Sequence, residues 1–209
     1  MRSNRSRSLR RFVTEYVALA VVAIVLASLI RSFLGLAFYI PSESMVPTLK
    51  VHDRVVVSRL SYHLHDPRRG DVVVFQNPQY PDKAQPNILK RALRNAFELV
   101  GMHQPKDKNL IKRLIGLPGD RLMVKDGGVW INGKRLAEPW LQKDVATDWS
   151  GNEGMEITVP SGHYFMMGDN RGNSCDSRCF PADKRFVPRS SMVGRAFVRV
   201  WPISRWGGL

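Results

Sequence analysis

Two serines, Ser42 and Ser44, stand one residue apart in a segment bounded by Pro41 and Pro47. A serine hydroxyl attacks a peptide carbonyl only when a nearby base removes its proton. The same residue type also caps turns through its side chain. The serine pair therefore points either to nucleophilic catalysis or to an ordinary turn, and the residues alone leave both interpretations open.

No histidine is an evident base for such a serine. Five histidines are present, but no serine lies in a Gly-x-Ser-x-Gly motif and no histidine lies in a recognisable catalytic context. His63 and His65 are spaced to share one face of a strand, yet they lack the companions of a metal site, which favours a surface position. A lysine is therefore the natural base to look for.

Lys112 lies in an apolar, strand-like block at 111–120. On a strand its side chain points to the same face as Leu114, whereas Arg113 points to the other face. A lysine has a reference pKa near 10.4, and this value must fall by roughly 2–3 pH units for useful basicity at neutral pH. Burial can provide such a change. Taken alone, the local sequence still favours a solvated strand lysine.

A third block, GDNRGNSCDSR at 168–178, is rich in polar and charged side chains. Together with PSESMVPTL at 41–49 and IKRLIGLPGD at 111–120, and in this order, it resembles the type I signal peptidases. That family cleaves secretory signal peptides with a Ser/Lys dyad. The resemblance extends from an apolar, membrane-length segment to about Gly194, and three blocks in order are more specific than any one of them.

The resemblance implies a role for individual residues. Ser44 becomes the nucleophile and Lys112 the general base, while the Ser42 hydroxyl and the Ser44 backbone N–H become donors to the oxyanion. Ser174 is expected to hydrogen-bond the lysine and hold its rotamer. Gly168 lies where the family has a small residue close to the substrate or the oxyanion. The other residues that the resemblance places around the dyad are Asp176, Arg178, Asp169, Arg113 and Met45.

Four of these residues are charged and are expected to support the site. Asp176 and Arg178 support the site, and Asp169 pairs with Arg113. A general structural ion pair is an equally good interpretation of each. Met45 helps to shield the dyad, although a flexible apolar side chain is equally suited to filling the core.

Cys175 and Cys179 depart from what the family pattern requires. In an extracytoplasmic domain they could form a disulfide around Asp176 and Arg178. A tight turn permits this bond, whereas an extended strand would hold the two Cα atoms about 13 Å apart. The sequence slightly favours the bond. Two cysteines make a zinc site improbable, and the resemblance implies no metal or organic cofactor.

The elements that position these residues begin with a basic N-terminus. Five arginines among the first eleven residues precede an uncharged stretch at 16–30. Fifteen residues rise only about 22 Å as a helix, so crossing the roughly 30 Å hydrocarbon core requires a span at 12–36. The arginines place residues 1–11 in the cytoplasm and residues 37–209 outside it. A cleaved signal peptide is the alternative, but no small-x-small site follows the apolar stretch.

The formal net charge of +14 first suggests a nucleic-acid-binding protein. The basic residues are dispersed, however, and the sequence has no zinc-finger spacing, RNP signature or helix-turn-helix pattern. Arginines directly before an apolar stretch instead favour attraction to anionic lipid headgroups. We therefore expect a lipid bilayer as the partner and no nucleic acid.

Beyond the membrane segment the pattern predicts a mostly β catalytic domain, sandwich- or barrel-like. Asp126-Gly127 and Asn132-Gly133 predict hairpin turns in a subregion at 121–160. The insert at 77–109 carries apolar residues at helical spacing, which predicts a basic amphipathic helix, packed on the domain or lying on the membrane. Short β-branched or apolar runs predict strands at 55–57, 71–75, 129–131 and 197–201, and the alternating pattern at 155–167 is interrupted by a predicted turn at 160–162.

We therefore expect a single-pass serine endopeptidase of the bacterial cytoplasmic (inner) membrane, with its catalytic domain outside. Its expected substrates are signal peptides of preproteins with small residues at positions −1 and −3. One alternative is a specialised peptidase of the same family, dedicated to a secretion or conjugation substrate. Others are a membrane-tethered binding module without catalysis and a Ser/Lys self-cleaving repressor. The membrane segment and the lack of DNA-binding helices count against the repressor.

Overall fold

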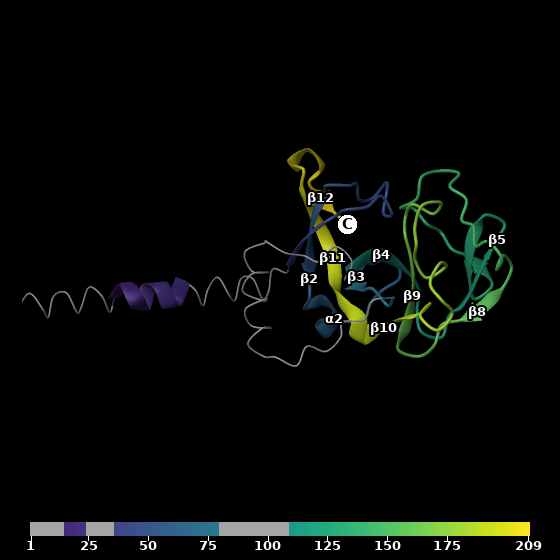
Figure 1. Cartoon of the computed structure of the whole chain (residues 1–209), viewed down its shortest axis with the longest axis horizontal. Coiled ribbons are helices and arrows are strands. Elements are labelled where there is room, and N and C mark those ends of the chain that lie inside the picture. Colours follow the sequence, from purple (N-terminus) through teal and green to yellow (C-terminus); the bar gives the residue numbers. More distant parts are fainter. Residues whose placement is uncertain (1–14, 24–35, 80–108) are drawn as a thin grey trace, which may run out of the picture.

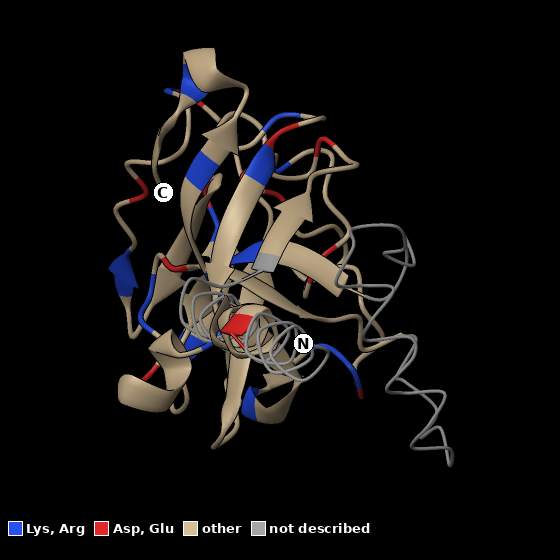
Figure 2. Cartoon of the chain, turned by 90° about the vertical axis from the view of Figure 1, so that its left-hand side faces the viewer, with Lys and Arg blue, Asp and Glu red and all other residues tan. Residues whose placement is uncertain are grey.

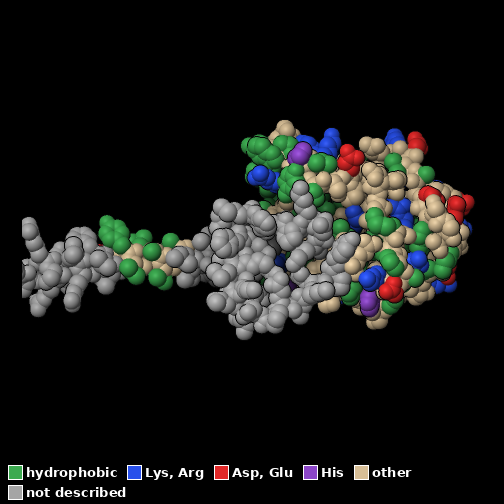
Figure 3. Space-filling model, in the orientation of Figure 1, with side chains coloured by type: hydrophobic (Ala, Val, Ile, Leu, Met, Phe, Trp, Pro, Cys, Tyr) green, Lys and Arg blue, Asp and Glu red, His purple; other side chains and the backbone are tan. Residues whose placement is uncertain are grey.

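The computed structural model describes residues 15–23, 36–79 and 109–209. Residues 15–23 form a helix whose apolar side chains are exposed, and Figure 3 shows them as a green band on its surface. No helix within these ranges is long and apolar enough to cross a membrane. The basic tail at 1–11, much of the expected span at 12–36 and nearly all of the insert at 77–109 lie outside the described residues.

The larger of two antiparallel sheets has eight strands. Its order is β1 (Leu36–Tyr39), β2 (Arg54–Ser58), β11 (Met192–Trp201), β3 (Val72–Gln76), β4 (Asn109–Gly116), β9 (His163–Met167) and β10 (Val187–Pro188), with β12 (Gly207–Gly208) paired to β11. β11, the last long strand, lies between β2 and β3 (Figure 1). One short helix and two 3-10 turns complete this part: α2 (Ser61–Leu64), η1 (Arg189–Ser191) and η2 (Ile203–Arg205).

The smaller sheet has four strands and follows directly after β4 along the chain. Its order is β7 (Lys134–Arg135), β6 (Gly128–Ile131), β5 (Arg121–Lys125) and β8 (Glu156–Thr158). Both of its tight turns have positive φ at their two central residues: 51° and 67° at Asp126 and Gly127, and 52° and 80° at Asn132 and Gly133. Asp-Gly and Asn-Gly suit this backbone. The two hairpin turns and the mostly β fold predicted from the sequence are confirmed.

Buried side chains shield the middle of the larger sheet from water on both faces. Val73 and Leu114 belong to one buried cluster, whereas Val72 and Val74 belong to another on the opposite face of the sheet. A third cluster joins the smaller sheet to β9 through Leu122 and Phe165, among others. β4 lies between β3 and β9 within this packing, so its side chains from Lys112 onward have little access to water.

Charged residues are distributed over the strands and loops of both sheets. In Figure 2 the Lys and Arg positions (blue) alternate with Asp and Glu positions (red) and form no continuous stripe on the face shown. Several of these charges are buried in pairs, and three such pairs lie in or beside the 168–178 block.

Candidate active site

Ser44 lies in a turn that leaves β1 and returns to β2. Two backbone hydrogen bonds define this turn: Val46 N–H donates to Glu43 O at 3.0 Å and Leu49 N–H donates to Met45 O at 2.8 Å. Met45 and Leu49 are both fully buried, and a turn lets both side chains enter the core of the larger sheet. Met45 is therefore a core residue as well as the immediate neighbour of Ser44.

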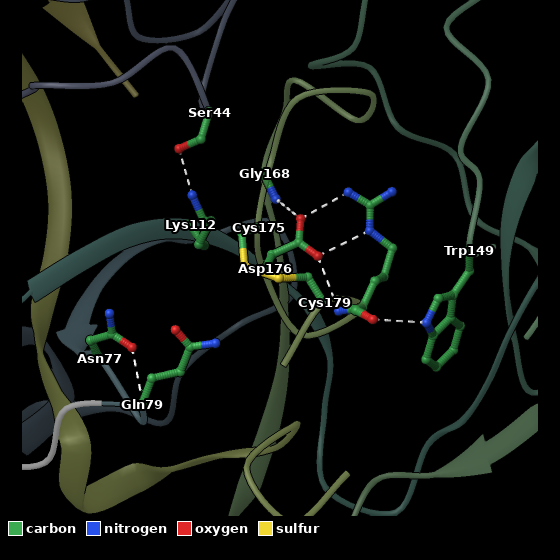
Figure 4. The surroundings of a disulfide bond; sticks show 10 residues. Ser44, Asn77, Gln79, Lys112, Trp149, Gly168, Cys175, Asp176 and Cys179 are labelled. Atoms are coloured by element: carbon green, nitrogen blue, oxygen red, sulfur yellow. Dashed lines mark hydrogen bonds and ion pairs between the residues drawn. A yellow bond between two sulfur atoms is a disulfide. The ribbon is translucent and has the colours of Figure 1, made fainter. Parts of the chain in front are cut away.

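Lys112 reaches Ser44 from the middle of β4. Its Nζ donates a hydrogen bond of 2.5 Å to Ser44 Oγ, and Figure 4 shows the two side chains pointing at each other. Lys112 is only 3% exposed and Ser44 8% exposed. Burial lowers the pKa of Lys112 to about 8; the Asp176 and Asp169 carboxylates oppose this change and the Arg178 guanidinium adds to it. A buried amine of lowered pKa beside a serine hydroxyl is chemically able to accept the proton of that hydroxyl.

Ser42 and Gly168 both lie close to Ser44. Ser42 Oγ is 3.4 Å from Ser44 Oγ, and its residue is exposed. A Cβ added at Gly168 would lie 2.4 Å from the Ser44 carbonyl oxygen and 2.2 Å from Ser174 Oγ, so no side chain fits there. The same carbonyl accepts a 3.1 Å hydrogen bond from the backbone N–H of Asn170. The 168–178 loop thus packs directly against the backbone of the nucleophile.

Ser174 differs from the expectation drawn from the family resemblance. Its Oγ is buried and has no hydrogen-bond partner in the described part of the chain, so the expected hydrogen bond to Lys112 is not formed. Lys112 Nζ is directed to Ser44 instead, and Ser174 packs against Gly168. The structure brings Ser174 into the site without giving its hydroxyl a partner.

Asp176 and Arg178 form a buried pair behind the dyad. Arg178 donates from Nε to Asp176 Oδ1 at 3.0 Å and from Nη2 to Oδ2 at 2.9 Å, and Gly168 N–H donates to Oδ2 at 2.9 Å (Figure 4). Burial by itself raises the pKa of Asp176. The hydrogen bonds and charge of Arg178, with the Gly168 N–H, outweigh burial and hold that pKa below its usual range.

A disulfide joins Cys175 and Cys179 around this pair. Their Cα atoms are 5.2 Å apart, because the chain turns tightly here and Cys179 N–H donates to Asp176 O at 2.8 Å. The sequence had left the bond open between a turn and a strand. The structure contains the turn, and the disulfide is formed.

Asp169 and Arg113 form a second buried pair on the opposite face of β4. Arg113 donates to the Asp169 carboxylate from Nε at 2.8 Å and from Nη2 at 2.6 Å. Thr48 Oγ1 donates to the same carboxylate at 2.5 Å, and the guanidinium lies 4.7 Å from the centre of the Trp140 ring. Thr48 links this pair to the nucleophile turn. Sequence reasoning assigned no role to Thr48 or Asn170, although both lie in the blocks 41–49 and 168–178, because their contacts join segments far apart in the chain.

The histidines of the sequence analysis lie elsewhere. His63 Nδ1 is 3.1 Å from Arg59 O and His65 Nδ1 is 2.9 Å from Asp66 O, and both contacts are exposed. Within the described ranges no group of three or more His, Cys, Asp or Glu side chains could hold a metal ion. In the same part of the chain no histidine is a hydrogen-bond partner of Ser44.

Comparison with known proteins identifies the family to which the chain is similar. A family model described as "Signal peptidase, peptidase S26" matches residues 13–201. "Probable signal peptidase I-2" of Synechocystis is 42% identical over 187 residues, which cover 90% of this chain and 72% of that protein. "Signal peptidase I" of Leptolyngbya laminosa is 40% identical over 188 residues, covering 90% and 79%. "Signal peptidase I" of Mycobacterium tuberculosis is 36% identical over 227 residues, covering 95% and 76%.

Among solved structures, a signal peptidase I of Enterococcus faecalis aligns with 63% of this chain and 97% of its own, at 28% identity and a TM-score of 0.41. The family match spans most of the chain and includes all three blocks that carry the site. The protein therefore belongs to the signal peptidase family, peptidase S26, and is a serine endopeptidase.

Proposed function

We propose that this protein removes N-terminal signal peptides from secreted preproteins with a Ser/Lys dyad, in which Ser44 is the nucleophile and Lys112 the general base. The observation that carries the proposal is the 2.5 Å hydrogen bond between Lys112 Nζ and Ser44 Oγ at an almost fully buried lysine. Ser42 Oγ, 3.4 Å from the nucleophile, lies close enough to take part in oxyanion binding.

The reaction begins when neutral Lys112 takes the proton of Ser44 and Oγ attacks the scissile carbonyl carbon. The Ser42 hydroxyl and the Ser44 N–H donate to the oxyanion that forms. Collapse of the tetrahedral intermediate breaks the C–N bond, and the Lys112 ammonium gives its proton to the leaving amine. A water molecule then attacks the acyl-enzyme carbonyl carbon while Lys112 accepts a proton from it. Collapse of this second tetrahedral intermediate breaks the ester bond to Ser44 Oγ, and the Lys112 ammonium returns the proton to Oγ, which restores the serine and the neutral lysine.

Burial is what makes this lysine useful at neutral pH. With a pKa of about 8, about one Lys112 in ten is neutral at pH 7. For a lysine at its reference pKa the neutral fraction is roughly one in several thousand. The surrounding valines and leucines of β3 and β4 thus contribute to catalysis by excluding water, without touching the substrate.

Substrate and location follow from the family and from the N-terminal sequence. We infer that the substrate binds as an added extended strand, with small residues at positions −1 and −3. Residues 1–11 form the cytoplasmic tail, 12–36 the membrane span and 37–209 the external catalytic domain, with the lipid bilayer of the inner membrane as partner. The arginines before position 12, the exposed apolar helix at 15–23 and the disulfide support this topology.

The test is processing of a preprotein by the full-length chain, with the cut mapped by N-terminal sequencing of the product. Ser44→Ala and Lys112→Ala should each abolish cleavage, a loss of at least about 10³-fold, because one removes the nucleophile and the other its base. Ser161→Ala and Lys125→Ala change the same residue types away from the dyad and should keep wild-type rates. Circular dichroism checks that all four variants fold. Cleavage retained by Ser44→Ala would overturn the proposal.

A further inference from the structure

The segment 136–149, the first part of the connection from β7 to β8, contacts the catalytic blocks although both of these strands belong to the smaller sheet. Its most extensive contact is with Arg171, whose side chain is completely buried. Arg171 donates from Nη2 to Glu138 Oε1, from Nη1 to Glu138 Oε2 at 2.9 Å, and from Nη1 to Thr147 Oγ1 at 2.5 Å. The Glu138 carboxylate and the Arg171 guanidinium therefore form a bidentate ion pair.

The third nitrogen of the Arg171 guanidinium, Nε, donates to the carbonyl oxygen of Gly168 at 3.1 Å. Gly168 is the residue that packs against the Ser44 carbonyl too closely for any side chain, and Asn170, one residue before Arg171, donates its N–H to that same carbonyl. A continuous set of contacts thus runs from Glu138 through Arg171 and Gly168 to the backbone of Ser44.

The same segment contacts two further arginines of the site. The Trp140 ring lies over the Arg113 guanidinium, with 4.7 Å between the guanidinium carbon and the ring centre. Asp148 O accepts a 2.9 Å hydrogen bond from Arg178 Nη1, and Trp149 Nε1 donates to Arg178 O at 3.0 Å. The segment therefore lies against each of the three arginines whose side chains hold the 168–178 loop.

Charge makes Glu138 the essential member of this segment. A guanidinium that is fully withdrawn from water keeps its charge, because arginine does not deprotonate in proteins, so it needs a buried counter-ion. Glu138 is the only acidic side chain with which Arg171 forms an ion pair among the described residues. Without that carboxylate Arg171 would have to move toward water, and its hydrogen bond to Gly168 O would be lost.

We propose that Glu138 is a positioning residue for catalysis, which acts through Arg171 to fix the Gly168 peptide against the nucleophile. It touches neither the substrate nor the reacting atoms; it determines where the Ser44 backbone, and with it the oxyanion donor, is held. The inference rests on the proposed function, since it takes Ser44 to be the attacking residue.

The experiment measures kcat and KM of the full-length chain on a synthetic peptide that spans a signal-peptide cleavage site. Glu138→Gln keeps the shape of the side chain and removes its charge. We expect kcat to fall about 10- to 100-fold, because a small displacement of a catalytic group is costly, while KM stays within about twofold. The matched control is Asp120→Asn in the Arg69–Asp120 pair, which has a 2.9 Å contact and no part in the site. This control should lower the melting temperature and leave kcat unchanged.

A double-mutant cycle separates positioning from general stability. If Glu138 acts through Arg171, the Glu138→Gln/Arg171→Gln variant is no slower than Arg171→Gln alone. If the two losses multiply, or if Glu138→Gln lowers only the melting temperature as Asp120→Asn does, the inference is overturned. Thr147→Val provides a milder variant if Glu138→Gln does not fold: it removes one contact of Arg171 and should lower kcat about threefold, and an unchanged kcat would contradict the inference.

The wild type and Ser44→Ala show whether a negative result concerns the proposed function or only the role of Glu138. When wild type cleaves and Ser44→Ala does not, the proposed function holds, and a normal kcat for Glu138→Gln overturns only the role of Glu138. A wild-type chain that cleaves no preprotein overturns the proposed function and this inference with it.

Discussion

β4 and the 168–178 loop meet at Ser44, but different interactions hold them in place. β4 is fixed by backbone pairing to β3 on one side and to β9 on the other, with Lys112 opposite Val73. The loop is fixed by side chains, through three buried arginine–carboxylate pairs. Many equivalent backbone hydrogen bonds thus hold Lys112 in position, whereas a few individual side chains hold the loop.

This difference predicts where single substitutions act most strongly. A change on β4 alters the chemistry of one side chain and leaves the register intact. A change in the loop removes a contact that nothing else replaces, because a buried charge that loses its partner is costly. The three predictions below test this contrast.

Apart from substitution of Ser44 or Lys112 themselves, the largest effect should come from Gly168→Ala. The added Cβ would overlap the Ser44 carbonyl oxygen and Ser174 Oγ, and the former is backbone that cannot move aside without displacing the nucleophile. We expect kcat to fall by about 10² or more, measured by peptide cleavage. Gly172→Ala is the matched control in the same loop, since its added Cβ would meet nothing within 4 Å and should leave kcat unchanged. Equal rates for the two variants would show that the loop adapts.

The pH dependence of cleavage tests the environment that the larger sheet gives Lys112. Lys112 acts when neutral, so kcat/KM should rise with pH, about tenfold per pH unit below the pKa of about 8, and level off above it. The cause is burial between the strands, which disfavours the ammonium. A rate profile of the wild type between pH 6 and 10 measures the midpoint. A midpoint near 10 would mean that the strand leaves Lys112 solvated in the working enzyme.

The smallest effect should come from Cys175→Ser/Cys179→Ser. Closing a loop of so few residues stabilises the folded state by about 2 kcal/mol in the chain-entropy description, so urea denaturation should show a loss of that size. The hydrogen bonds from Gly168 and Arg178 to Asp176 remain, so kcat should fall far less than in Gly168→Ala. Wild type treated with a dithiol reductant is the control. A loss of kcat as large as that of Gly168→Ala would mean that the disulfide, and not the ion pairs, holds the loop.

Local features of the fold were predictable from the sequence, because neighbouring residues decide them. Asp126-Gly127 and Asn132-Gly133 accept positive φ and therefore identify two hairpin turns before any tertiary contact is known. The strands around Val73 and Val129 follow from β-branched runs in the same way. The turn at Ser44 did not follow, since it depends on the simultaneous burial of Met45 and Leu49.

The residues of the site and one of their contacts were predictable. The family resemblance named Ser44, Lys112, Asp169 and Asp176 and paired Asp169 with Arg113, and the structure supplies the remaining contacts. The burial of Lys112 could not be read from its own strand, because β3 and β9 and the layers packed on them produce it. Arg171 received no role, because its partner Glu138 lies 33 residues away in a segment with no recognisable motif.

The place of β11 in the larger sheet also links the two parts of the chain that carry the dyad. Ser44 follows β1 and precedes β2, while Lys112 belongs to β4, which is paired to β3. β2 and β3 do not pair with each other; β11, made near the end of the chain, fills the place between them. Within the larger sheet, β11 is therefore the strand that joins the part that carries Ser44 to the part that carries Lys112. A chain truncated before β11 would lack both pairings that this strand makes, so we expect it to show no proteolytic activity.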